Sequence, residues 1–390
     1  MLAYGAEKAL SRAGRWAYNP ASPAITCFVW VFESDVLARF GGMGYFRDNV
    51  ERAAGYVPGF QPRSADVVKL NTNENPYPPS PGVLEALAAL RAEQLRRYPD
   101  PVGTAFREAA AEVHGVEPAN VMCCNGGDDL LSIAIRACCD DRRPLAYPVP
   151  TYSLYPVLAR LHGCETIEVP FDGEFNLPPK LARTGAALTI LCNPNAPTAT
   201  LIDPGEVASL ASELEGVLLI DEAYVDFAEQ DCIALTREFD NVIVLRSLSK
   251  GYSLAGLRFG YAIAPQGLIE GLLKVKDSYN VDALAIAVAT AAIRDRAYFR
   301  ENVEKVKRDR AILTERLREL GFIVPESQTN FVLAPPPSGS AGAIYEELAG
   351  RNIFVRYFDV PGLRDKLRIS VGTPEQNEKL IAALREIVAQ

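Results

Sequence analysis

A repeated alternation of short apolar strands and amphipathic helices constrains this chain more than any other feature of its sequence. Between residues 120 and 264, continuously apolar runs of strand length are separated by segments whose apolar residues recur at helical spacing. Strands that are apolar on both faces and joined by helices are typical of a mostly parallel sheet covered on both sides. We therefore predict an α/β fold with a mostly parallel, seven-stranded sheet. The predicted strands lie in NVMCCN, RPLAYP, CETIEVP, ALTILCNPN, VLLIDEAY, NVIVLRSLS and RFGYAIA.

The pattern changes after about Leu284. Long helical segments there lead into three shorter strands and a closing helix, which indicates a smaller α+β domain. We predict that residues 81–284 form a large, ligand-binding domain, and that residues 43–80 and 285–390 form the small one. The predicted strands of the small domain lie in NFVLAP, IFVRYF and KLRISVG.

Residues 1–42 differ from the rest of the chain. They lack clean periodicity and contain both tryptophans, whereas Met43 opens a stretch that reads like a natural beginning. The apolar run Ala24–Phe32 is too short to span a bilayer. We interpret residues 1–42 as a loose N-terminal extension or as the result of a start site placed too far upstream.

Composition excludes several classes of function. The 390-residue chain has a formal net charge of −9, which gives no basic face for nucleic acid, and we expect no membrane partner. It has only two histidines, His114 and His162, too few for a histidine-rich metal site and an argument against a Ser-His-Asp hydrolase. We expect both on helix surfaces, and no metal site. The eight cysteines lack zinc-site spacing, so we predict reduced core thiols in a cytoplasmic protein.

The polar residues that could carry chemistry follow the strands. The segments NPN, DEAY and SLSK each come directly after an apolar run. Ligands of open α/β sheets bind at the carboxyl ends of the strands. These segments therefore predict a binding site at one edge of the sheet.

Four residues near this edge match the needs of pyridoxal phosphate chemistry. Such an enzyme requires a lysine that forms a Schiff base with the cofactor aldehyde, and a carboxylate at the pyridine nitrogen. Lys250 in SLSKGYSLAGLR is the candidate lysine. Asp221 ends an apolar strand, where a buried carboxylate needs a cationic partner. Tyr224 could reach the ring hydroxyl, and Tyr152 could stack on the ring face.

A phosphate-binding corner is predicted beside this lysine. NGGDD opens a helix, so the backbone amides around Gly127 and Asp128 could receive a phosphate at a helix N-terminus. Ser247, Ser249 and Arg258 flank Lys250 and supply further donors. The sequence thus provides a candidate for each part of the cofactor.

Five motifs, in this order along the chain, resemble those of the histidinol-phosphate aminotransferase family, which are fold-type I pyridoxal phosphate enzymes. The resemblance extends from about Met43 to the C-terminus. It implies an aspartate aminotransferase-like fold and the exchange of an amino group between L-histidinol phosphate and 2-oxoglutarate, a step of histidine biosynthesis. The motifs are KLNTNENPYPPSP, RYPDP, DEAYVDF, SLSKGYSLAGLRFGY and LRISVG.

The resemblance also implies further roles. Lys250 would move the proton between the donor carbon and the cofactor. Tyr98 would reach the cofactor phosphate of a neighbouring subunit, which implies a homodimer. Arg368 would bind the substrate carboxylate, whereas Arg356 and Tyr56 would recognise the far end of the substrate, where histidinol phosphate carries its phosphate.

The sequence departs from the family pattern in the loop NPNAPTAT. The position of the asparagine that usually contacts the ring hydroxyl is Ala196, and a usual glycine is Ala199. Asn195, one residue earlier, is the candidate replacement. Asp129 stands where glutamate is more usual.

Other functions of the same fold stay open at this point. An aromatic amino acid aminotransferase and a threonine-phosphate decarboxylase would need the same cofactor residues. A non-catalytic cofactor-binding regulator is an alternative of another class, although Lys250 argues against it.

Overall fold

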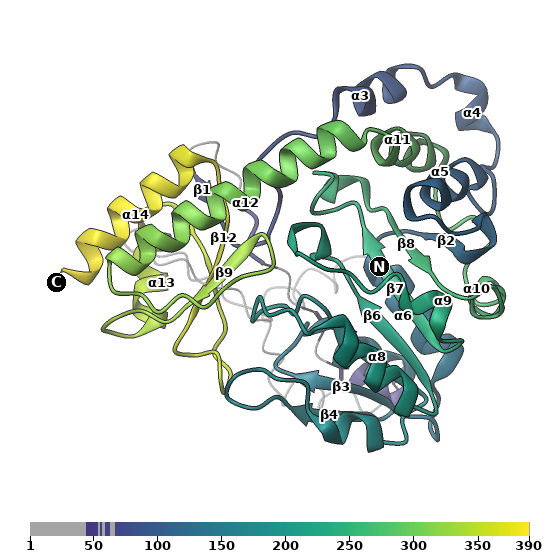
Figure 1. Cartoon of the computed structure of the whole chain (residues 1–390), viewed down its shortest axis with the longest axis horizontal. Helices are drawn as coiled ribbons and strands as arrows, with labels where there is room; N and C mark the ends of the chain where they lie inside the picture. Colours follow the sequence, from purple (N-terminus) through teal and green to yellow (C-terminus); the bar gives the residue numbers. More distant parts are fainter. Residues whose placement is uncertain (1–43, 54, 57–58, 63–66, 390) are drawn as a thin grey trace, which may run out of the picture.

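The computed structural model describes residues 44–53, 55–56, 59–62 and 67–389. The N-terminal extension proposed for residues 1–42 lies outside this part of the chain. Two groups of elements are separated along the long axis of the molecule (Figure 1). One is built on a large sheet and the other on two small sheets.

The large sheet has seven strands in the order β2-β8-β7-β6-β5-β3-β4. β8 runs antiparallel to both of its neighbours, and the other pairs are parallel. The prediction of a seven-stranded, mostly parallel sheet is confirmed. The strands are β2 (Val121–Cys124), β3 (Leu145–Val149), β4 (Thr166–Pro170), β5 (Leu188–Cys192), β6 (Val217–Asp221), β7 (Val242–Ser247) and β8 (Gly260–Ile263).

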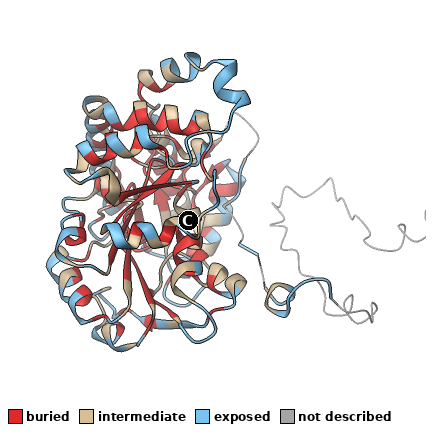
Figure 2. Ribbon diagram, turned by 90° about the vertical axis from the view of Figure 1, so that its right-hand side faces the viewer, coloured by how far each residue is buried: buried red, intermediate tan, exposed pale blue. Residues whose placement is uncertain are grey.

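Helices cover both faces of this sheet, which explains why its central strands are buried at almost every position. Figure 2 shows these strands as a buried layer between helices whose outer faces are exposed. Each fully buried leucine or isoleucine stabilises the fold by about 1.5–3 kcal/mol relative to exposure. One core contains residues of α6 (Gly127–Cys138), α7 (Leu154–His162) and α10 (Gln266–Leu273). The other contains residues of α5 (Thr104–His114), α8 (Pro204–Glu213), α9 (Leu235–Glu238) and α11 (Ala283–Arg294).

The smaller part combines two sheets. β11 (Arg356–Tyr357), β12 (Leu367–Ser370) and β9 (Phe331–Ala334) form an antiparallel sheet, and β1 (Val68–Lys69) pairs in parallel with β10 (Ile353–Phe354). The helices of this part are α12 (Arg296–Glu319), α13 (Ala341–Gly350) and α14 (Pro374–Val388). The α+β character of this part agrees with the fold class predicted from the sequence.

The long helix α12 joins the two parts (Figure 1). Before it, α11 packs against α5 and α3 (Pro81–Ala88) beside the large sheet. β1 brings the segment before residue 81 to the small sheets. The domain limits at residues 80/81 and 284/285 stay predictions. The described chain also contains two short α-helices, α2 (Asp48–Glu51) and α4 (Ala92–Arg96), and four 3-10 helices.

Helix starts follow from local sequence. Asp203 caps α8 by accepting a hydrogen bond from Gly205 N at 2.8 Å, with a proline at the first helical position. Thr373 and Gln376 form a capping box at the start of α14, because each side chain bonds the backbone N–H of the other. These caps satisfy amides that would otherwise lack partners.

The histidines and cysteines bear on the sequence predictions. His114 bonds the Tyr261 hydroxyl at 2.8 Å, and His162 bonds Ser132 at 2.9 Å. Both histidines end helices and are partly exposed, which agrees with the expected helix-surface positions, but each ring is half-buried and hydrogen-bonded. The seven described cysteines are all free and five are buried, as predicted for core thiols. Within the described residues, no helix has the length and apolarity needed to cross a membrane.

Candidate active site

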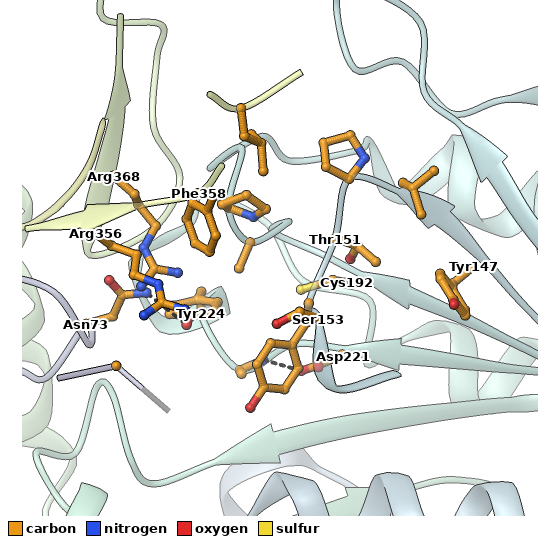
Figure 3. A pocket seen from close by; sticks show the side chains of 18 of the residues that line it. Asn73, Tyr147, Thr151, Ser153, Cys192, Asp221, Tyr224, Arg356, Phe358 and Arg368 are labelled. Carbon is orange, nitrogen blue, oxygen red and sulfur yellow. Dashed lines mark hydrogen bonds between the residues drawn. The ribbon is translucent and has the colours of Figure 1, made fainter. Parts of the chain in front are cut away.

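A pocket of ≈ 1040 Å³ lies between the carboxyl edge of the large sheet and the small part. Figure 3 shows two arginines and an aromatic ring entering it from the small part, with Asp221 beside the strands of the large sheet. Elements far apart in the sequence therefore meet here, as the switch-point rule for such sheets predicts. The predicted site residues in its lining are Tyr56, Gly127, Asp128, Tyr152, Asp221, Tyr224, Ser247, Ser249, Lys250, Arg258, Arg356 and Arg368.

Asp221 ends β6 and is buried, with only 4% of its surface exposed. Its Oδ1 accepts a hydrogen bond from Ala223 N at 3.1 Å, and its Oδ2 accepts one from the Tyr155 hydroxyl at 2.8 Å. Burial raises the pKa of Asp221 to about 6, against the opposing effect of Tyr155. None of the ion pairs among the described residues includes this carboxylate. A buried carboxylate without a cationic partner is suited to a cationic ligand.

Lys250 follows β7 and points into the pocket. Its Nζ donates to Thr72 O at 3.2 Å and lies 5.5 Å from the centre of the Tyr224 ring. Burial lowers the pKa of Lys250 to about 8, with a contribution from the positive charge of Arg368. Asn75 Nδ2 donates to the carbonyl of Lys250 at 3.0 Å and so fixes its backbone. An amine with such a pKa is partly neutral near physiological pH and can act as a nucleophile.

The N-terminus of α6 and Arg258 form the predicted phosphate corner. Arg258 Nη2 lies 3.3 Å from Asp128 Oδ2, and the Asp128 carboxylate also accepts from the Tyr152 hydroxyl at 3.3 Å. Gly126 has a φ of 81°, and a Cβ there would lie 2.7 Å from Arg258 Nη2. Glycine at this position thus permits both the turn and the close approach of the guanidinium. The corner combines a helix N-terminus with a cation, which suits an anion.

The two serines and the tyrosines border the same space. Ser247 Oγ accepts from Ser249 N at 3.1 Å, and both serines are buried in the pocket lining. Tyr56 meets the Tyr152 ring edge to face, with ring centres 6.1 Å apart. Tyr56 therefore helps to restrict the Tyr152 ring before any ligand stacks on it.

Tyr224 has a partner that sequence reasoning missed. Its hydroxyl accepts a hydrogen bond from Asn73 Nδ2 at 3.0 Å, and burial raises the pKa of Tyr224 to about 12. Asn73 is fixed in turn by Ser370, which donates to its Oδ1 at 2.8 Å. The motif NTNENP contains Asn73, but only the folded chain brings it next to Tyr224.

Arg356 and Arg368 lie opposite each other on the paired strands β11 and β12. Arg368 donates to Asn71 O at 2.9 Å, whereas its buried Nε has no hydrogen-bond partner. Its guanidinium lies 5.2 Å from the Phe331 ring centre and 5.4 Å from that of Phe358. Neither arginine takes part in an ion pair with a described carboxylate. Two guanidinium groups with unused donors can bind carboxylate or phosphate in a bidentate manner.

Two predicted residues are not brought into the pocket. Asn195 is 1% exposed, and its amide bonds Pro150 O, Thr198 Oγ1 and Thr151 Oγ1 within the surrounding loops. The pocket is lined at this place by Ala196 and Pro197 instead. The expectation that Asn195 supplies the ring-hydroxyl contact finds no support in this geometry.

Tyr98 is the second predicted site residue that lies outside the pocket. It is 81% exposed and stacks on Tyr279, with ring centres 4.5 Å apart. This position lies outside the lining of the pocket of its own chain. Its role toward a neighbouring subunit stays a prediction.

The described residues fit pyridoxal phosphate. Asp221 offers a buried carboxylate to a protonated ring nitrogen, Tyr224 offers a hydroxyl, and Lys250 offers an amine of lowered pKa. Arg258 and the glycine-led start of α6 offer an anion site. The chemistry of the donor set therefore matches each part of this cofactor.

The sequence pattern of a known family covers most of this chain. The family described as "Aminotransferase class I and II" matches residues 65–384. Fold and site thus define a class of enzymes that transfer amino groups with the help of a bound cofactor.

Curated relatives narrow this class. A histidinol-phosphate aminotransferase 1 of Trichormus variabilis is 51% identical over 88% of this chain and 99% of its own length. A histidinol-phosphate aminotransferase of Citrifermentans bemidjiense is 46% identical over 87% and 98%. The chain therefore belongs to the class I and II aminotransferases and, within them, to the histidinol-phosphate aminotransferase family.

A solved structure agrees with this assignment. The histidinol-phosphate aminotransferase of Sinorhizobium meliloti in complex with pyridoxal-5'-phosphate has a TM-score of 0.81 and 26% identity, over 90% of this chain and 99% of that one. An L-threonine-O-3-phosphate decarboxylase from Porphyromonas gingivalis, at 23% identity and a TM-score of 0.73, shows that the fold is shared beyond transamination.

Proposed function

We propose that this chain exchanges an amino group between L-histidinol phosphate and 2-oxoglutarate, with pyridoxal phosphate as cofactor. The observation that carries the proposal is the pair of guanidinium groups, Arg356 and Arg368, without carboxylate partners in the pocket that holds Lys250 and Asp221. Histidinol phosphate, glutamate and 2-oxoglutarate all present an anionic group to such a wall. The relatives at 46–51% identity support the same substrate.

Pyridoxal phosphate, when bound, supplies an aldehyde carbon and a ring that accepts electrons. Lys250 would bind the aldehyde through its neutral amine and later move a proton at the amino-bearing carbon of the donor. Asp221 would hold the proton at the ring nitrogen, and the Tyr224 hydroxyl would face the ring oxygen. Arg258 and the start of α6 would hold the cofactor phosphate.

Steady-state kinetics with 2-oxoglutarate as acceptor test this proposal. The panel of donors is L-histidinol phosphate, tyrosine, phenylalanine and threonine phosphate. We expect kcat/KM for histidinol phosphate to exceed that for tyrosine by more than tenfold, about 1.4 kcal/mol of discrimination. A tenfold preference for tyrosine would instead indicate an aromatic amino acid aminotransferase. Carbon dioxide release from threonine phosphate, without consumption of 2-oxoglutarate, would indicate the decarboxylase.

We further propose that the active form is a cytoplasmic homodimer in which Tyr98 completes the neighbouring site. Exposed apolar side chains either lie close to Tyr98 in the sequence or contact its ring, which supports a covered surface there. They are Leu84 and Leu87 of α3, Leu95 of α4, and Tyr279, the stacking partner of Tyr98.

Mixing two inactive variants tests this arrangement. Lys250→Ala and Tyr98→Ala protomers are unfolded together and refolded into hybrid dimers. One site of each hybrid would then hold both Lys250 and the partner's Tyr98, so activity should exceed that of either parent. Hybrids no more active than the parents would show that Tyr98 does not act across the interface.

A further inference from the structure

Tyr155 contacts the most deeply buried carboxylate of the active site. It lies in α7, its ring is fully buried, and its hydroxyl donates to Asp221 Oδ2 at 2.8 Å. The other oxygen of Asp221 accepts from Ala223 N at 3.1 Å. Each carboxylate oxygen therefore accepts one hydrogen bond, and the two bonds together set the plane of the carboxylate. Asp221 still lines the pocket.

The phenol itself has little freedom to move. The Tyr155 ring meets Tyr152 edge to face, at 5.6 Å between centres and 86°, and it meets Tyr147 at 5.9 Å and 61°. Tyr152 and Tyr155 are three residues apart at the start of α7. One short segment thus places an aromatic ring in the pocket wall and a hydroxyl on the carboxylate behind it.

We propose that Tyr155 is a positioning residue of this enzyme, whose hydroxyl orients the Asp221 carboxylate and keeps it ionised for the ring nitrogen of the cofactor. This inference rests on the proposed cofactor. It assigns to α7 a role in catalysis that does not require contact with the substrate or the cofactor.

Electrostatics support this geometry. Burial raises the pKa of Asp221 to about 6, and the hydrogen bond from Tyr155 is the largest effect that opposes burial. Without the hydroxyl, the pKa of the carboxyl group would lie higher still, and a protonated Asp221 cannot pair with a protonated pyridine. The other titratable groups near Asp221 are Asp128, Cys192, Tyr224 and Lys250.

The test is cofactor binding to the cofactor-free chain as a function of pH, for the wild type and for Tyr155→Phe. In the wild type, affinity for pyridoxal phosphate should fall as the pH drops through about 6, because Asp221 becomes protonated. Loss of one charge-assisted hydrogen bond should move this midpoint up by about one pH unit. Binding by the variant should then be about fivefold weaker at pH 6 and nearly equal at pH 8.5.

A cofactor analogue with carbon in place of the ring nitrogen separates this role from simple damage to the pocket. Wild type and Tyr155→Phe should bind that analogue with equal affinity, because it offers Asp221 no charge. In an Asp221→Asn background, Tyr155→Phe should cause no further loss. With the full enzyme, kcat should fall while the KM of the donor stays near its wild-type value, since Arg368 is untouched.

Tyr261→Phe is the matched control, because Tyr261 is also a buried tyrosine but its hydroxyl bonds His114. This control should keep the wild-type midpoint. An unchanged midpoint in Tyr155→Phe, or equal losses for the cofactor and its nitrogen-free analogue, would overturn the inference. A wild-type chain that binds no pyridoxal phosphate at any pH would instead overturn the proposed cofactor, and with it the role of Tyr155.

Discussion

The active site has two walls, one formed by the large sheet and one by the small sheets. They differ in how many of their polar groups have hydrogen-bond partners within the chain. On the side of the large sheet, both oxygens of Asp221 and the amine of Lys250 have hydrogen-bond partners. On the side of the small sheets, the buried Nε of Arg368 has no hydrogen-bond partner, and the guanidinium lies against the aromatic rings of Phe331 and Phe358. The first wall is organised before any ligand arrives, as a permanent cofactor requires. The second keeps donors free for substrates that enter and leave.

The loss of Lys250 should have the largest effect, because no other group replaces a covalent amine. We expect Lys250→Ala to lower kcat by at least about 10⁴-fold and to remove the visible absorbance of the bound cofactor. The midpoint of thermal unfolding should stay close to that of the wild type. Lys307→Ala, on α12, is the control and should keep full activity. Turnover in Lys250→Ala near the wild-type rate would show that Lys250 is not the amine that binds the cofactor.

Arg368→Lys tests the second wall. Lysine keeps the charge but cannot form a planar, bidentate contact, so kcat/KM for the donor should fall by about 10²-fold, mostly through KM. The affinity for pyridoxal phosphate should change little, since the residues that would hold the cofactor lie on the opposite wall. Arg351→Lys, a surface change on an ion-paired arginine, should leave both constants unchanged. A loss of cofactor affinity in Arg368→Lys would contradict the assignment of cofactor binding to the first wall and substrate binding to the second.

A pH series on the cofactor-free chain measures the first wall more finely. With the pKa of Lys250 at about 8, the neutral fraction of the amine rises about fivefold between pH 7 and pH 8 and levels off above pH 9. The rate at which the chain captures pyridoxal phosphate, followed by stopped-flow absorbance, should rise in the same way. A rate that climbs steadily to pH 10 would indicate an ordinary, solvated lysine.

The smallest change in activity is expected for Asn195→Ala. Its amide joins Pro150, Thr151 and Thr198, so its loss should lower the free energy of unfolding by about 1–3 kcal/mol. Because Asn195 does not line the pocket, kcat should stay within about threefold of the wild type. Calorimetry and kinetics on the same variant separate the two effects. A large fall in kcat without loss of stability would restore Asn195 to the site.

The sequence by itself determined the class of fold and the chemistry of the cofactor side. Mostly apolar runs such as LTILC and VLLID require burial on both faces, which leaves few alternatives to a helix-covered parallel sheet. Asp221 ends one such run and Lys250 comes shortly after another, so both reach one edge of the sheet because parallel strands end there together. Arg258 reaches the same edge because it comes just before β8, which runs antiparallel to β7.

Contacts between distant segments were decided only by the tertiary structure. Asn73 meets Tyr224 across 151 positions, and Tyr155 meets Asp221 across 66. No local pattern encodes such pairs, since they depend on how helices and small sheets pack over the large one. Asn195 is the opposite case, a contact that the sequence suggested and the fold does not form. Its motif suggested a contact with the cofactor, but packing directs its amide to hydrogen-bond partners in the surrounding loops. The amino-acid sequence determines which side chains are available for a site, and tertiary packing decides which of them face the pocket.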